Sequence, residues 1–154
     1  MHCKALGTFG PYFSIEFKAK LESTPIVVNQ VVAAGSVSLF NRYQLKLHAY
    51  PHPNQEQFEL VRHFGLTMEK EKWIVWHFVL KTVHGAWTGC KAIYLDGGNC
   101  RTEQGVRRLL QWINEIHRWG LCEYALECED DIKHILSRAP NNVRVLGVGI
   151  GGLV

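Results

Sequence analysis

The sequence has 154 residues, of which 47% are hydrophobic and 20% are charged. This length suits one domain that buries about 68–70% of its unfolded surface, and the composition excludes a disordered or fibrous protein. The net charge of +3 permits nucleic acid as a partner without requiring it.

Cysteine usage and hydropathy indicate the compartment. The five cysteines are scattered and include no Cys-x-x-Cys pair, which argues against a disulfide framework or a structural zinc site. Residues 1–10 lack the apolar core of a signal peptide, and the apolar stretch 73–80 is too short to cross a bilayer. We therefore expect an intracellular protein, cytoplasmic or nuclear, with no membrane role.

The first half of the chain predicts a strand, a helix and a second strand. Residues 12–18 alternate between apolar and polar side chains, as a strand with one apolar face does. Residues 26–43 carry the apolar positions of a helix, and residues 44–50 alternate again. Residues 51–57 predict a polar loop, whereas residues 58–72 fit either a short helix or a strand.

Two further strands are predicted in the middle of the chain. Residues 73–82 are almost all apolar or aromatic, which is typical of a strand covered on both faces. Residues 87–95 predict another strand. We expect it to end at the Asp-Gly-Gly-Asn sequence of residues 96–99, because Gly and Asn tolerate the positive φ angles of turns.

The last third predicts two helices. Thr102 is a good N-cap for a helix that runs to Trp119 and stops at Gly120. A second helix is expected over residues 121–138, followed by a loosely held apolar, Gly-rich tail at 139–154. This order of elements predicts a single α/β domain over residues 1–154, with a mixed central sheet flanked by helices.

Glu16 and Lys18 are the first candidates for chemistry. They lie two residues apart on a predicted strand, so their side chains leave the same face. A carboxylate ligates Mg²⁺ or Mn²⁺, and a neighbouring lysine stabilises negative charge during phosphodiester hydrolysis. From spacing alone, a solvated strand face is the commoner meaning of such a pair.

Longer segments resemble a known family. PYFSIEFKA, then NQVVAAGSVSLFNRY, and later WTGCKAIYLDGGNCRTEQGVRRLLQWINEIHRWGL resemble fungal proteins with a PD-(D/E)XK nuclease-like domain, over about residues 10–135. The resemblance implies a restriction-endonuclease-like core and a nucleic-acid substrate. It also implies that Glu16 is the metal ligand, that Lys18 is the catalytic lysine and that Gln30 lies beside the active site.

The sequence departs from this family in one respect. The family has an Asp on the preceding strand, whereas residues 1–15 contain no Asp or Glu. The core would therefore be shortened on its N-terminal side. Because one carboxylate holds Mg²⁺ poorly, three explanations are open: Asp96 or Glu22 takes the role of the Asp, the sequence is a fragment of a longer protein, or the site is impaired or repurposed.

Two alternatives remain open. In the first, the fold acts as an isomerase or cyclase on a small apolar metabolite, with His77 or His84 as acid or base. Asp96 is a further candidate acid or base, and a separate hypothesis is that His84, Trp87 and Asp96 meet in a small polar pocket at a sheet edge. In the second, the protein is a non-catalytic binding module that forms a homodimer through an exposed sheet edge.

Overall fold

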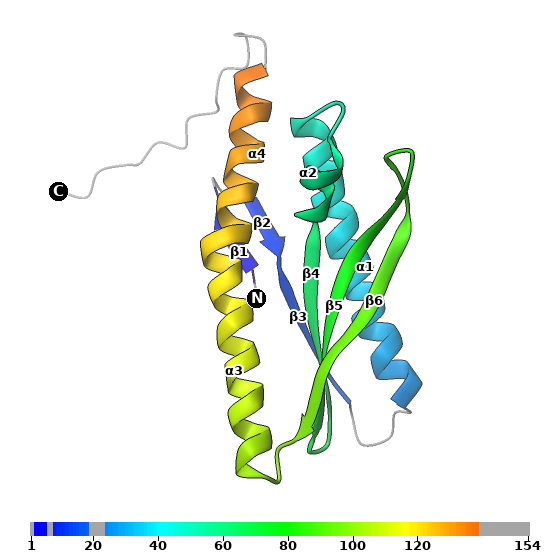
Figure 1. The fold of residues 1–154 in the computed structure, drawn as a ribbon, viewed down its shortest axis with the longest axis vertical. Helices are drawn as coiled ribbons and strands as arrows, with labels where there is room; N and C mark the ends of the chain where they lie inside the picture. Colours follow the sequence, from blue (N-terminus) through cyan, green and yellow to red (C-terminus); the bar gives the residue numbers. More distant parts are fainter. Residues whose placement is uncertain (1, 6–7, 19–23, 139–154) are drawn as a thin grey trace, which may run out of the picture.

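Four strands form the central sheet of this protein. The computed structural model describes residues 2–5, 8–18 and 24–138. The sheet is mixed, has the order β3-β4-β5-β6 and is flanked by helices, which confirms the predicted α/β class (Figure 1). Its strands are β3 (Phe13–Phe17), β4 (Arg62–Glu69), β5 (Lys72–Val83) and β6 (Ala86–Asn99). A hairpin of β1 (His2–Ala5) and β2 (Thr8–Pro11) precedes them.

The connection between β3 and β4 determines where the site lies. These two strands are parallel, and the helix α1 (Thr24–Ala49) links them, because parallel neighbours need a crossover connection. The short helix α2 (Gln55–Glu59) then leads into β4, and Asn54 caps it by accepting from the Gln57 N–H. The remaining neighbours in the sheet are antiparallel. As a result, β3 is an edge strand of the four-stranded sheet.

Helix α1 is longer than its sequence pattern predicts. The strand predicted over residues 44–50 is wrong, since the helix continues to Ala49. Leu45 and Leu47, which alternate like strand residues, pack against two different hydrophobic clusters. Lys46 lies between them and is buried beside Asp131. The alternation therefore arises from a helix with apolar neighbours on two sides.

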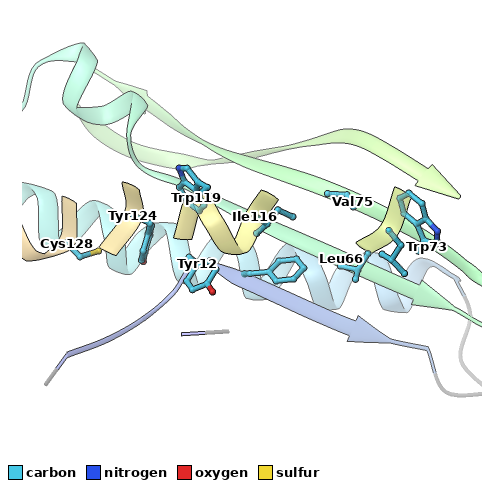
Figure 2. Close-up of a cluster of buried hydrophobic side chains, with 10 residues drawn as sticks. Tyr12, Leu66, Trp73, Val75, Ile116, Trp119, Tyr124 and Cys128 are labelled. Carbon is cyan, nitrogen blue, oxygen red and sulfur yellow. The ribbon is translucent and has the colours of Figure 1, made fainter. Parts of the chain in front are cut away.

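Each face of the sheet has its own hydrophobic core. Helix α1 covers one face, and a long helical rod covers the other (Figure 1). On the α1 side, the buried residues are Val31, Leu39, Tyr43, Val61 and Phe78. The opposite core includes Tyr12, Leu66, Trp73, Val75, Ile116, Trp119 and Tyr124 (Figure 2). Both faces are thus covered, in agreement with the apolar sequence of β5.

The helical rod continues where its sequence predicts a break. Thr102 caps α3 (Glu103–Trp119) by accepting from the Gly105 N–H, as expected. Helical structure does not stop at Gly120. A π-helical turn (Gly120–Tyr124) leads directly into α4 (Ala125–Arg138). Gly120 is needed for close packing, because a Cβ there would lie 2.3 Å from the Tyr12 ring.

The predicted turn at residues 96–99 is also absent. These residues belong to β6, which pairs with β5 as far as the Lys72–Asn99 pair. Gly98 makes room for Trp73, whose ring would lie 2.5 Å from a Cβ at that position. Within the described ranges, no helix is long and apolar enough to cross a membrane. The tail expected at 139–154 lies outside them.

Candidate functional site

Glu16 and Lys18 lie at the edge of the sheet, on the face that α1 covers. Ser14, which has the same side-chain direction, hydrogen-bonds His63 of β4 at 2.9 Å. The Lys18 N–H donates to the Met68 carbonyl at 2.8 Å, so β3 follows β4 up to this residue. Side chains of β4 therefore lie next to Glu16 and Lys18 on the predicted common face of β3.

Strand β4 supplies a second carboxylate, that of Glu69. The Lys18 ammonium donates to the Glu69 carboxylate, and these side chains are 12% and 31% exposed. Glu16 pairs with Thr67 in the parallel register, so Glu69 is its diagonal neighbour on the next strand. Strands about 4.8 Å apart with a rise of about 3.3 Å per residue place the Cα atoms of such diagonal neighbours about 8 Å apart. Two long carboxylate side chains at this separation can both reach one cation.

A recess lies next to this charged group. It has a volume of about 290 Å³ and opens between the first turns of α1 and the strands β4 and β5. Its lining residues are Val27, Val28, Thr67, Glu69, Lys72 and Ile74. Glu16 is not among them, since it stands one strand away. Trp76 donates its ring N–H to the Thr67 hydroxyl at 3.2 Å, which fixes one wall.

The donor atoms suit a hard cation. Among the residues that the structure describes, no three His, Cys, Asp or Glu side chains converge as a complete metal cage. Mg²⁺ is usually held by one or two carboxylates, with water and substrate phosphates as its other ligands. Glu16 and Glu69 match that requirement, and carboxylates are also the usual ligands of Mn²⁺.

Two of the predicted site residues, Gln30 and Asp96, lie away from Glu16, Lys18 and Glu69. A third, Glu22, is not among the described residues. Gln30 is exposed on α1. Asp96 belongs to β6, where it accepts from the Trp112 ring N–H at 2.7 Å and from Arg108. Asp96 therefore links α3 to the sheet through side-chain hydrogen bonds, on the face opposite α1.

The histidines proposed as acid or base have different surroundings. His77 is half-buried and stacks on the Phe64 ring at 5.0 Å. Burial lowers the pKa of its imidazole, and the charge of Arg62 lowers that pKa further. His84 is exposed in the β5–β6 turn, with φ of 49°. The structure thus places His77 within the sheet and His84 at its tip.

The expected pocket of His84, Trp87 and Asp96 does not form. Trp87 packs near the β5–β6 turn, where its ring lies 5.8 Å from that of Tyr43. Asp96 is further along the same strand, about 30 Å away at roughly 3.3 Å per residue. His84 and Trp87 therefore lie near the β5–β6 turn, and Asp96 lies toward the other end of β6.

Three neighbours of the site were not foreseen from the sequence: His63, Thr67 and Glu69. His63 is 1% exposed, and burial lowers its pKa to about 4, so its imidazole is neutral at pH 7. Residues 63–69 alternate in side-chain direction with these three on one face. This alternation predicts that His63, Thr67 and Glu69 share one face of β4. Only the pairing of β3 with β4 places that face beside Glu16 and Lys18.

Comparison with known protein families, with curated proteins and with solved structures gave no match.

Proposed function

We propose that this protein is a divalent-metal-dependent phosphodiesterase of the PD-(D/E)XK nuclease-like kind, with Glu16, Lys18 and Glu69 at its centre. One observation carries the proposal: the Lys18–Glu69 contact brings a second carboxylate to the sheet face that bears Glu16 and Lys18. Glu69 thereby takes the role of the Asp that the sequence before β3 lacks.

The two carboxylates have complementary roles. Glu16 and Glu69 would hold Mg²⁺ or Mn²⁺ between neighbouring strands, with the remaining positions left for water and a substrate phosphate. When bound, such a cation polarises the phosphate and makes water a stronger nucleophile. Both carboxylates belong to backbone-paired strand residues, so their Cα positions are set before any substrate arrives.

Lys18 is suited to the charge that develops during hydrolysis. The water oxygen bonds to phosphorus, the bond between phosphorus and the leaving oxygen breaks, and the proton released by the attacking water passes to the leaving oxygen. Negative charge accumulates on the phosphate oxygens in this process, and a nearby ammonium stabilises it. The Lys18 side chain is 12% exposed and held by Glu69, so the ammonium is oriented in advance.

The recess offers space for the phosphate. It adjoins Glu69 and is lined by Lys72, whose side chain is exposed at the start of β5. The first turn of α1 contributes Val27 to the opposite wall. The amino end of a helix carries a partial positive charge that favours anions. Lys72 thus supplies a cation to the recess, and the first turns of α1 lie along its other side.

Cleavage assays with Mg²⁺ or Mn²⁺ test this function. The full chain is incubated with labelled single- and double-stranded DNA and with RNA. We expect metal-dependent cleavage that falls at least about a hundredfold in Glu16→Gln and Lys18→Ala, since both groups act on the transition state. Glu115→Gln is the matched control, because Glu115 is an exposed residue of α3.

Metal binding gives a second readout. Calorimetric titration with Mn²⁺ alone should show one site in the unaltered protein and in Glu115→Gln, and a weakened site in Glu16→Gln. Absence of cleavage with either metal on every substrate would contradict the proposal. Equal activity of Glu16→Gln and the unaltered protein would contradict it as well.

A further inference from the structure

A large aromatic side chain is exposed next to the recess. Tyr94 of β6 is 58% exposed and lies on the α1 face of the sheet, opposite Trp76. The two rings meet edge to face, with their centroids 6.2 Å apart. This arrangement leaves much of the Tyr94 ring accessible to solvent while Trp76 supports it from the side.

Gly97 allows the Tyr94 ring to lean toward the recess. A Cβ on Gly97 would lie 3.0 Å from the Tyr94 hydroxyl and 3.5 Å from Ile74 Cγ1. The Tyr94 side chain therefore extends along β6 to a point beside Ile74, which lines the recess. A larger residue at position 97 would push the ring away.

Trp76 also links the aromatic pair to Thr67, the cross-strand partner of Ile74 on the sheet side of the recess. Its ring N–H donates to the hydroxyl of Thr67, which also lines the recess and pairs with Glu16 across the strands. Tyr94 and Trp76 are thus held at a fixed position relative to the candidate catalytic group.

We propose that Tyr94 is a stacking subsite for an unpaired base of a single-stranded nucleic acid whose phosphate enters the recess. The inference rests on the proposed function and specifies its substrate. Single-strand binding combines aromatic faces with a cationic path for the backbone. Here the aromatic face is Tyr94, and the cations at the same end of the sheet are Lys72, Lys70 and Arg101, the last of which is 3.3 Å from Glu71.

Single strands fit this geometry better than duplexes. In a duplex, each base is already stacked between its neighbours, so an isolated aromatic ring has no base face to cover. An unpaired base exposes its π-face, and base–aromatic stacking tolerates any sequence. We therefore expect a preference for single strands with little sequence specificity.

Fluorescence anisotropy with a labelled oligothymidylate in EDTA tests the subsite without cleavage. Tyr94→Ala should bind about tenfold to a hundredfold more weakly than the unaltered protein. Tyr94→Phe keeps the ring and should bind within about twofold. Leu110→Ala is the control, because Leu110 is a similarly exposed residue of α3, at 54%, and its binding should be unchanged.

The outcomes separate this inference from the proposed function. Glu16→Gln should lose cleavage and keep Tyr94-dependent binding. If Tyr94→Ala binds as tightly as the unaltered protein, or if the unaltered protein binds no oligothymidylate, the subsite is overturned whether or not cleavage occurs. If binding depends on Tyr94 but no substrate is cleaved, the subsite stands and the phosphodiesterase proposal fails.

Discussion

Two groups of charged side chains in this molecule differ mainly in their access to water. The first, called here the buried cluster, joins α1 to α4 and consists of Arg42, Lys46 and Asp131. The second, called here the open cluster, lies at the edge of the sheet and consists of Glu16, Lys18 and Glu69. Both place a carboxylate against a cation, so the ion pairs alone do not distinguish them.

The buried cluster is closed to any ligand. Its three side chains are 1–4% exposed, and Asp131 accepts from both Arg42 and Lys46, the latter at 2.8 Å. Glu127 adds a carboxylate 3.6 Å from the Arg42 guanidinium. Charges held in this way serve the structure, because exchange of a partner would leave an ion in an apolar interior.

The open cluster can exchange its partners. Glu69 is 31% exposed and lines the recess, so water or a ligand can compete for its oxygens. Solvent access, and not the presence of an ion pair, separates a structural charge group from a candidate site. Substitutions and changes of pH distinguish the two clusters experimentally.

The largest effect is expected for Asp131→Ala. This change leaves two buried cations without their common partner, and breaking such an ion pair costs about 3–5 kcal/mol. Urea denaturation at pH 7 measures the change in the free energy of unfolding. Asp130→Ala, at a neighbouring residue with a 69% exposed side chain, should change it by less than about 0.5 kcal/mol. A loss below about 1 kcal/mol in Asp131→Ala would remove the distinction between the clusters.

Acid should destabilise the protein through His63. Its folded pKa is about 4, below the unfolded value near 6.5. Between these pH values the unfolded chain binds more protons, so stability is complete above about pH 6.5 and is lost as the pH falls toward 4. The free energy of unfolding should fall by about 2–3 kcal/mol between pH 7 and pH 4.5. The fall should be smaller in His63→Gln. Urea midpoints at pH 7 and 4.5 measure it, with His48→Gln as the exposed control. Parallel pH profiles of the two variants would refute this.

Asp96 should also contribute at low pH, by a smaller amount. Burial opposes its ionisation, but hydrogen bonds from Trp112, Gly97 and Arg108 outweigh burial and lower its pKa. Its contribution is therefore present above the unfolded pKa near 3.9 and is lost as the pH falls below it. Asp96→Asn should cost about 1–2 kcal/mol at pH 7. Trp112 fluorescence reports the change, and equal acid midpoints for variant and parent would argue against it.

The open cluster should respond in activity more than in stability. Glu69→Gln should cost at most about 1 kcal/mol, because its partly exposed carboxylate is solvated in part. We expect cleavage to fall by at least about tenfold, since one metal ligand is lost. Urea denaturation and the cleavage assay, performed on the same preparation, separate the two effects. A loss of stability as large as that in Asp131→Ala would show that the pair is structural.

The smallest effect is expected for a fully solvated pair on α4. Lys133 and Glu129 lie 2.8 Å apart with side chains 60% and 42% exposed. Glu129→Gln should change the free energy of unfolding only slightly, as is usual for exposed ion pairs on a helix. The change should vanish in 1 M NaCl, because salt screens exposed charges.

The sequence predicted elements well where a local pattern decided them. The alternation around Glu16 and the Thr102 cap required only neighbouring residues, and both appear as expected. The end of α1 was missed because Lys46 looks like an exposed strand residue until Asp131, 85 residues later, neutralises it. Gly120 was mistaken for a helix stop because its packing partner, Tyr12, lies far away in the sequence.

The candidate site was predictable only in part. Its two β3 residues follow from spacing, but Glu69 becomes their neighbour through the parallel pairing of β3 with β4. No local pattern reveals that pairing, because the 26-residue helix α1 separates the strands. Tyr94 likewise gains its position from Gly97 and from Trp76 on the adjacent strand.

The buried cluster has a consequence for synthesis of the chain. Arg42 and Lys46 emerge from the ribosome long before Asp131, and until then α1 has two cations on a surface destined for the interior. Its C-terminal end cannot dock stably in that interval, because both cations would be buried without their counter-charge. Helix α4 must therefore close the fold late, and a nascent chain halted before residue 131 should remain a client of chaperones.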